Sequence, residues 1–515
     1  MEPININKQQ KTTWFIAFFT FCLLFLVSPD SYTHDLFNRA DSSIFFMCGK
    51  AWMNGMIPYV DFTDSKGPLL WIIYGIGYLI SHYDYIGVFW LSILLYWGIF
   101  YYTYKLANIS LSDKYLSTIC VLFISLYIFC PWYHYEIRAE DWCLFFVILA
   151  IYRVSLHLYS NQTVSLNKTS YVLGICIAGT LLIKYSISVM MGTIIAYTLY
   201  YLIREKKNVI APILCFILGI ATIILPFLIY FLTKGDLYAF VSEYFLNTFK
   251  TIHNSNSFGT YIHELFCVFA NSSEAILFTT SIVGCYLFSR TIEKYKFFPL
   301  FIVLGFWMIT IHHASDYYFS ICTFFPVWLI IILLQKVKYY FQNNPKRKII
   351  YISLTVIAFC TLWNYTFTQG YLLRNLFFYN NNNRSDYYNV AQLMSQIEKP
   401  TVIYMHFTVS HGEGMPVAVL PGSKYFFSQL GATKDMDQEQ REDVKKGKAD
   451  FIIIDTEQLT NSEKELLNDG NYHKCYEYPF WFHQYCVFTK HNLRTPDNNI
   501  KMSNLDVLLK RNYLK

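Results

Sequence analysis

The sequence predicts a polytopic α-helical membrane protein with a long first outer loop and a small C-terminal extracytoplasmic α/β domain. Charged residues make up 15% of the 515 residues, whereas soluble domains carry about 25%. Hydrophobic residues reach 54% and aromatic residues 19%, a bias typical of lipid-facing helices and their interfaces. Apolar runs that approach the roughly 20 residues needed to cross a bilayer recur up to residue 366, and their number predicts about eleven transmembrane helices.

The eleven runs are separated by polar loops. They occupy residues 14–27, 85–104, 115–131, 141–158, 170–186, 187–203, 209–232, 273–289, 297–313, 317–335 and 349–366. Basic residues such as Lys105, Arg204 and Lys346 follow every second run, whereas the first outer loop is acidic. The positive-inside rule therefore predicts a cytoplasmic N-terminus and an external C-terminal domain, which suits a bacterial inner (cytoplasmic) membrane.

The first outer loop, about residues 29–84, is not a clean transmembrane run. Phe, Met and Trp residues separate its charges, which predicts helices that lie in the membrane interface.

The character of the chain changes after residue 366. The sequence predicts a membrane module over 1–366, a linker over 367–384 and an α/β domain over 385–515. Within this domain, strands are expected at 401–407 and 450–455, helices at 385–398 and 434–448, and a hairpin from 472–478 and 483–490. Cys475 and Cys486 lie on the two arms of the hairpin, so a disulfide between them is a hypothesis in an oxidising compartment.

Charge and cysteine placement exclude several function classes. The balance of 41 Lys+Arg against 35 Asp+Glu gives a net charge of only +6, and the basic residues are spread between apolar runs. This pattern gives no support for nucleic acid as a partner, and membrane lipids are the expected surroundings. No Cys-x-x-Cys pair occurs, so a zinc or thioredoxin-type site has no support either.

The first outer loop holds the densest set of candidate functional residues. These are Asp41, Asp61, Asp64 and Lys66, set among Gly and Pro residues. Acidic and basic groups at the edge of the bilayer could meet a lipid phosphate. The alternative is a solvated loop whose charges only mark topology.

A second set of candidates recurs at the outer ends of later runs. It comprises Glu136, Arg138, Glu140, Asp141, Lys184, His312, His313 and Tyr317. Glu140 and Asp141 could instead cap the helix that they begin. Lys184 could extend to the membrane interface, and the two His residues could simply provide polarity there. Glu136 and Glu140 would share one helix face only if that helix began early.

Carboxylates for proton abstraction and cations for phosphate are thus expected on the outer face, near lipid. Transfer of a sugar from a polyprenyl phosphate needs that combination, because a carboxylate accepts the proton of the acceptor hydroxyl and a cation stabilises the departing lipid phosphate.

The first-loop pattern resembles that of bacterial GT-C glycosyltransferases. It runs from Asp41 through Gly49-Lys50, Gly55, Pro58-Tyr59, Asp61 and Asp64 to Lys66-Gly67-Pro68, with support from Glu140-Asp141, Lys184 and His313–Tyr318. The similar group contains protein mannosyltransferases and lipid A aminoarabinose transferases.

The resemblance implies roles for individual residues. Asp41 would be the base or acceptor-positioning acid. Glu140 or Asp141 would match the second acidic position, where some members bind a divalent metal or help orient the acceptor. Lys66 and Lys184 would contact the lipid phosphate. The implied donor is a polyprenyl-phosphate sugar, and the acceptor a lipid, glycan or protein. A transporter or flippase of lipid-linked sugars, and a polymerase or ligase that uses a lipid diphosphate donor, are the alternatives.

Overall fold

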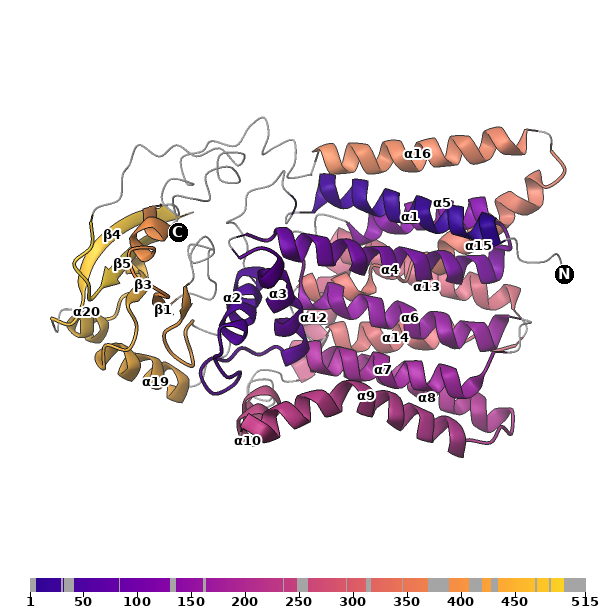
Figure 1. Cartoon of the computed structure of the whole chain (residues 1–515). Coiled ribbons are helices and arrows are strands. Elements are labelled where there is room, and N and C mark those ends of the chain that lie inside the picture. The colour runs from indigo at the N-terminus through magenta and orange to yellow at the C-terminus, as the bar shows by residue number, and fades with distance from the viewer. Residues whose placement is uncertain are drawn as a thin grey trace. The chain divides into compact units, whose positions relative to one another are not determined.

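The computed structural model describes most of the chain (Figure 1). The chain divides into two compact units. The described residues are 6–28, 31, 41–82, 84–129, 136–160, 164–234, 236–247, 258–292, 294–311, 316–344, 346–368, 389–406, 419–427, 434–467, 470–480 and 483–494. The first unit comprises Met1–Val27, Ser92–Phe227 and Asn256–Tyr371, and the second comprises Ser28–Leu91, Leu228–Ser255 and Leu372–Lys515. The predicted linker lies almost entirely outside the described residues.

All eleven predicted runs form helices in this structure. They are α1 (Ile6–Val27), α4 (Ile86–Leu111), α5 (Lys114–Ile128), α6 (Ala139–Tyr159), α7 (Leu166–Ile183), α8 (Tyr185–Arg204), α9 (Ile210–Lys234), α13 (Ser272–Thr291), α14 (Phe298–Ile311), α15 (Val327–Phe341) and α16 (Arg347–Thr368). Figure 1 shows α6, α7 and α8 running alongside one another, and these helices contact each other pairwise.

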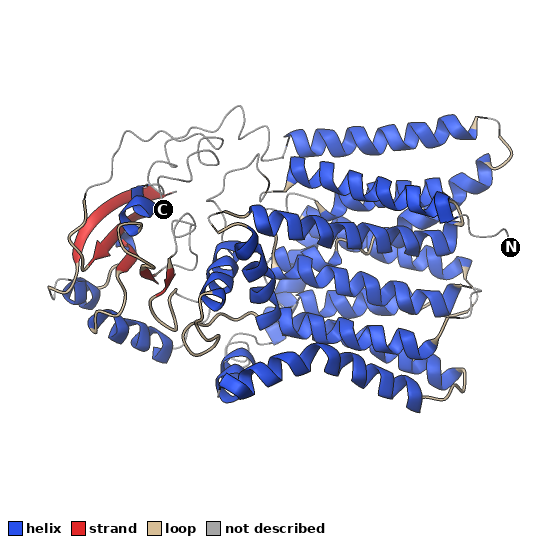
Figure 2. Cartoon of the chain, viewed as in Figure 1, coloured by secondary structure: helices blue, strands red, loops and turns tan. Residues whose placement is uncertain are grey.

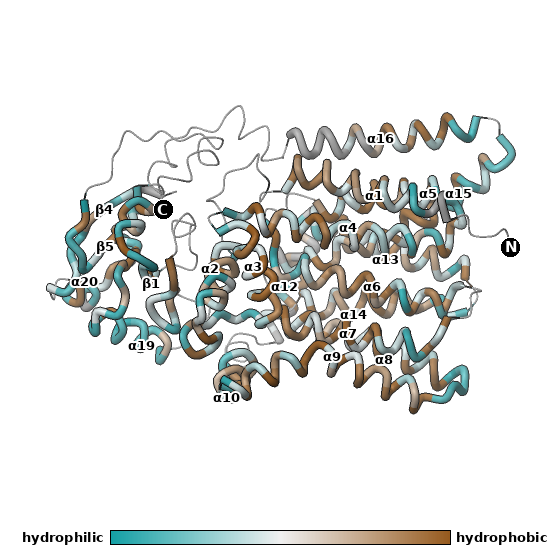
Figure 3. The backbone as a smooth tube through the Cα atoms, viewed as in Figure 1, coloured by the Kyte–Doolittle hydropathy of each residue, from teal (hydrophilic) through white to brown (hydrophobic). Residues whose placement is uncertain are grey.

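Seven helical segments in the described part of the chain are long and apolar enough to cross a membrane, which makes this a multi-pass membrane protein. They belong to α1, α4, α6, α7, α8, α9 and the segment Tyr318–Phe341 that contains α15. The most apolar segment lies in α9, whose mean hydropathy reaches 2.7, and Figure 3 shows this helix as largely hydrophobic. α5 and α14 are apolar but shorter, with 15 and 14 residues.

The segment predicted to be the first outer loop folds into two packed helices, α2 (Asp41–Met53) and α3 (Pro68–Ile80), in the second unit. α3 begins with a proline, whose missing N–H is tolerated in the first helical turn. The two helices approach closely because Gly49 has no side chain: a Cβ there would lie 2.5 Å from the backbone nitrogen of Gly75.

Four further short helices are described in the two units. Within the second unit these are α10 (Leu237–Phe240) and the π-helix η1 (Val241–Asn247); within the first they are α12 (Phe258–Ala270) and the 3-10 helix η2 (Asp316–Cys322).

The C-terminal domain contains a five-stranded mixed sheet in the order β2-β1-β3-β5-β4, and Figure 2 shows the strands together in this part. The strands are β1 (Thr401–Met405), β2 (Leu420–Pro421), β3 (Phe451–Asp455), β4 (His473–Phe480) and β5 (His483–Thr489); the helices α19 (Lys434–Lys445) and α20 (Asn461–Leu467) and the 3-10 turn η3 (Thr456–Gln458) accompany them. β4 and β5 pair antiparallel, so the predicted hairpin is confirmed.

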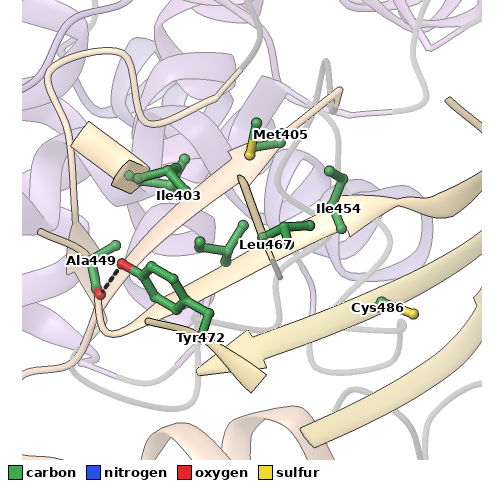
Figure 4. Packing of buried hydrophobic residues seen from close by; sticks show 9 residues of the cluster. Ile403, Met405, Ala449, Ile454, Leu467, Tyr472 and Cys486 are labelled. Atoms are coloured by element: carbon green, nitrogen blue, oxygen red, sulfur yellow. Dashed lines mark hydrogen bonds between the residues drawn. The ribbon is translucent and has the colours of Figure 1, made fainter. Parts of the chain in front are cut away.

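One face of the sheet buries an apolar cluster (Figure 4). Ile403 and Met405 of β1 and Ile454 of β3 pack there with Leu467 of α20. The Tyr472 hydroxyl donates a 2.8 Å hydrogen bond to the carbonyl oxygen of Ala449, so the ring reaches the cluster without losing its polar partner. This core gives the C-terminal part its own hydrophobic support.

The structure does not form the hypothesised disulfide, because both Cys475 and Cys486 are free thiols. A register shift between Lys474 and Tyr476 moves Cys475 out of register with Cys486, which faces Glu477 instead. The Cys475 thiol donates to the Val487 carbonyl at 3.3 Å, and Cys486 is buried in the apolar cluster.

The close contact between α2 and α3 yields a stability prediction. Gly49→Ala should lower the free energy of unfolding by about 1–3 kcal/mol, because the added methyl group meets backbone atoms that cannot rotate away. Gly192→Ala in α8 is the matched control, since nothing lies within 4 Å of the added Cβ, and it should be neutral or slightly stabilising. Unfolding of the two purified variants in mild detergent checks this; equal midpoints would contradict the close packing.

Candidate functional site

The structure gathers three of the first-loop candidates near the first turn of α2. Asp41 is the first residue of this helix and is half-buried. The Lys66 ammonium lies 5.7 Å from the ring centre of Phe45, one turn further along α2. Repulsion from Asp41 contributes to the raised pKa of Asp64. We call Asp41, Asp64 and Lys66 the first-loop cluster.

Asp64 is the most enclosed member of the first-loop cluster, with 6% of its surface exposed. Its Oδ1 accepts hydrogen bonds from the Ser65 backbone N–H at 2.6 Å and hydroxyl at 3.3 Å. Its Oδ2 is buried and has no hydrogen-bond partner among the described residues. Burial raises the pKa of Asp64, the Lys66 ammonium opposes this rise, and repulsion from Asp41 adds to it.

The segment from Asp64 to Lys66 forms a short hydrogen-bonded relay. The Lys66 ammonium donates to the Ser65 hydroxyl at 3.1 Å, and that hydroxyl donates to Asp64. The Tyr59 hydroxyl donates to the Lys66 carbonyl oxygen at 3.0 Å. Tyr59 is fully buried, adopts a left-handed φ of 67° and packs against Trp71. The loop backbone is therefore held in place, and with it the charged side chains.

Asp61 lies in the same loop but is used for local structure. Its Oδ2 accepts a 2.6 Å hydrogen bond from the Ile57 backbone N–H, which closes the turn that contains Tyr59. Lys50 of α2 belongs to the first-loop motif but not to the predicted site residues, and it is fully buried. Burial lowers the pKa of Lys50 to about 7. A lysine among apolar neighbours gives no local signal that distinguishes it from one at a helix surface.

A second group of predicted residues is buried in the first unit, at the beginning of α6. The Lys184 ammonium, between α7 and α8, forms an ion pair with Glu140. It also lies 3.8 Å from the ring centre of Tyr318 in η2, which is a cation–π contact. Lys184 therefore has two partners inside the protein. We call this set, with the neighbouring Glu136, Arg138 and Asp141, the α6 cluster.

The other members of the α6 cluster are also paired. Arg138 Nε donates to Glu136 Oε1 at 3.0 Å. Asp141 Oδ2 accepts from the Arg138 backbone N–H at 2.8 Å, and its Oδ1 accepts from the Tyr96 hydroxyl at 2.9 Å. Asp141 thus caps its own helix. α6 begins at Ala139, so Glu136 precedes the helix and does not share a helical face with Glu140.

The remaining candidates stay predictions. His312 and His313 lie outside the described residues, as does the side chain of Tyr317. In the part of the chain that the structure describes, no group of three or more His, Cys, Asp or Glu side chains could hold a metal ion. A groove of about 400 Å³ between α1, α5 and α16 is lined by Lys11, Phe15, Lys114 and Tyr351, and none of the predicted site residues line it.

Comparisons with solved structures identify the fold. The chain is similar to ArnT from Cupriavidus metallidurans bound to undecaprenyl phosphate, with a TM-score of 0.58 and 9% identity over 94% of this chain and 98% of that one. The apo form of the same protein gives a TM-score of 0.52 at 10% identity, with the same coverage. The Archaeoglobus fulgidus oligosaccharyltransferase aligns with 92% of this chain and 72% of its own at 12% identity, with a TM-score of only 0.46.

The similarity to the two ArnT structures confirms the expected GT-C type of fold over most of the chain. No family model and no curated protein matches the sequence. At 9% identity the likeness concerns the fold and not the roles of individual residues.

The α6 cluster yields a second stability prediction. Lys184→Met leaves Glu140 buried without its cation and should lower the free energy of unfolding by about 3–5 kcal/mol. The Glu140→Gln/Lys184→Met double variant should recover much of this loss. Lys294→Gln breaks the exposed pair with Glu205 and should cost no more than about 1 kcal/mol. Denaturant titration of detergent-purified protein measures all three; similar losses for the two single variants would refute the buried pair.

The surroundings of Asp64 yield a titration prediction with opposite signs for two neighbours. Lys66→Gln removes an attraction and should raise the pKa of Asp64 further, whereas Asp41→Asn removes a repulsion and should lower it. Infrared titration of the carboxyl band, assigned by its loss in Asp64→Asn, measures both. Shifts of the same sign in both variants would contradict the geometry of the first-loop cluster.

Proposed function

We propose that this protein transfers a sugar from a polyprenyl-phosphate donor to a hydroxyl-bearing acceptor at the membrane surface. The observation that carries the proposal is the first-loop cluster, in which two carboxylates and an ammonium group gather at one helix start. The shared fold with ArnT, which has been seen with undecaprenyl phosphate, supports a lipid phosphate as the chemical class of donor.

In the proposed reaction, the acceptor oxygen attacks the anomeric carbon of the donor sugar. The bond between that carbon and the phosphate oxygen breaks, and polyprenyl phosphate leaves with the electron pair. Asp41, the half-buried carboxylate, accepts the proton of the acceptor hydroxyl. The Lys66 ammonium stabilises the negative charge on the leaving phosphate. A direct displacement of this kind inverts the anomeric configuration.

The proposal does not place the catalytic base in the α6 cluster. Glu140 is paired with Lys184 and Asp141 caps α6, so neither is assigned the role of base. Substrate binding by Lys184, Arg138 and Glu136, like that by His312, His313 and Tyr317, stays a prediction. The same holds for a divalent metal at Glu140 or Asp141.

The proposal includes a location and a topology. The eleven helices would cross a bacterial cytoplasmic membrane, with the N-terminus inside and the first outer loop and C-terminal domain outside. A polyprenyl tail would lie among the helices, which accounts for a reaction site carried by a mostly apolar chain. The boundaries at residues 366 and 385 stay predictions.

The test is release of free polyprenyl phosphate from a panel of polyprenyl-phosphate sugars, with membranes supplied as acceptor. Sugar-selective release by the wild type is expected. Asp41→Asn should lower turnover by at least about 100-fold while undecaprenyl phosphate still binds, because general base catalysis typically contributes 10²–10⁴-fold.

Asp61→Asn is the matched control, since Asp61 closes a local turn, and it should retain most of the activity. Equal release by wild type and Asp41→Asn would remove Asp41 from the base role. No release from any donor would favour a flippase of lipid-linked sugars, or an enzyme that uses a lipid diphosphate donor.

A further inference from the structure

The C-terminal domain contacts the first outer loop within the second compact unit. The contact is made by Ser423–Phe427, which follow β2 and which we call the docking loop. The Lys424 carbonyl oxygen accepts a 3.0 Å hydrogen bond from the backbone N–H of Thr63, the residue directly before Asp64. Thr63 is buried, so this bond is shielded from water.

Glu243 binds two side chains of the docking loop, next to the hydrogen bond between Lys424 and Thr63. Its Oε1 lies 2.6 Å from the Lys424 ammonium, and the Tyr425 hydroxyl lies 3.2 Å and 3.3 Å from its two carboxylate oxygens. The Glu243 side chain is only 8% exposed, so this is an almost buried charge with defined partners. Glu243 belongs to the π-helix η1. π-Helical turns are rare overall, but those that occur are often found at functional sites.

The docking loop is equally well fixed on the side of its own domain. Gln440 of α19 donates 2.7 Å and 3.2 Å hydrogen bonds to the carbonyl oxygens of Tyr425 and Tyr404. The Tyr404 backbone N–H in β1 donates to the Phe426 carbonyl at 2.7 Å. The Ser423 hydroxyl donates to Asp443 at 2.8 Å. A continuous set of bonds therefore connects the sheet to Thr63.

We infer that the docking loop positions Asp64 and Lys66, so that the C-terminal domain is part of the scaffold of the first-loop cluster. The segment Thr63–Lys66 is held at one end by the Lys424 carbonyl and at the other by the Tyr59 hydroxyl. Glu243 and Lys424 are positioning residues, because they act on the cluster through the backbone of Thr63. The expected effect on catalysis rests on the proposed function. The mechanical part, in which the docking loop holds the backbone of Thr63–Lys66 in place, does not depend on that function.

Hydrogen–deuterium exchange of the full-length protein in detergent tests the mechanical part without any substrate. Glu243→Gln weakens the Lys424 contact and should speed exchange in peptides covering residues 60–67 by about tenfold. Glu442→Gln, which breaks the exposed pair with Lys446 in the same domain, should leave these peptides unchanged. Tyr425→Phe removes only a hydroxyl group and keeps the test valid if Glu243→Gln fails to fold; it should show a smaller rise at the same peptides.

A double-mutant cycle tests whether Glu243 acts through Lys424. The Glu243→Gln/Lys424→Met variant should exchange no faster at residues 60–67 than the faster single variant. Additive effects, or unchanged exchange at these residues in Glu243→Gln and Tyr425→Phe, would overturn the inference.

The catalytic part is read from donor turnover. kcat/KM in Glu243→Gln should fall about tenfold and should remain at the wild-type value in Glu442→Gln. If exchange rises but no donor is turned over even by the wild type, the positioning role holds and the proposed reaction fails. If the wild type is active and Glu243→Gln exchanges faster at full activity, the docking loop does not position the catalytic groups.

Discussion

Charge burial is the constraint on which the rest of this structure depends. In a chain with 54% hydrophobic residues, ionisable groups inside the fold are shielded from water, so a buried charge is stabilised by a partner within the protein. The α6 cluster meets this requirement internally: Glu140 is paired with Lys184, Glu136 with Arg138, and Asp141 with Tyr96 and a helix N-terminus. Such pairing fixes the beginning of α6 and gives its acids structural roles.

The first-loop cluster meets the same requirement differently. Asp64 is nearly as buried, yet one of its oxygens has no partner in the described part of the chain, and its neighbours include a second carboxylate as well as an ammonium group. Asp64 therefore keeps an oxygen without a described partner, whereas Glu140 is held in an ion pair. Because Glu140 and Asp141 are already paired, the proposal places the base in the first loop and not in the α6 cluster.

Close backbone packing makes this arrangement rigid. α2 and α3 meet at Gly49 and Gly75 with no room for a side chain, and Tyr59 adopts a left-handed conformation that its burial against aromatic rings sustains. The docking loop adds a third support through Thr63. A loop supported from three directions can hold charged groups in a fixed geometry, which sites of chemistry require.

The sequence by itself determined the elements, because helix and strand formation follow from apolar run length and periodicity. It predicted eleven helices, the hairpin of β4 and β5, and the residues that would carry charge near the outer ends of helices. Only the tertiary structure decided which charges meet. Glu140 and Lys184 are 44 residues apart and Glu243 and Lys424 are 181 apart, so no local pattern connects them. The register shift beside Cys475 and the start of α6 after Glu136 were likewise set by pairing and capping, which depend on distant backbone and on the ends of elements. Partner choice is a property of the folded chain, because burial decides whether a charge needs a partner and packing decides which partner it reaches.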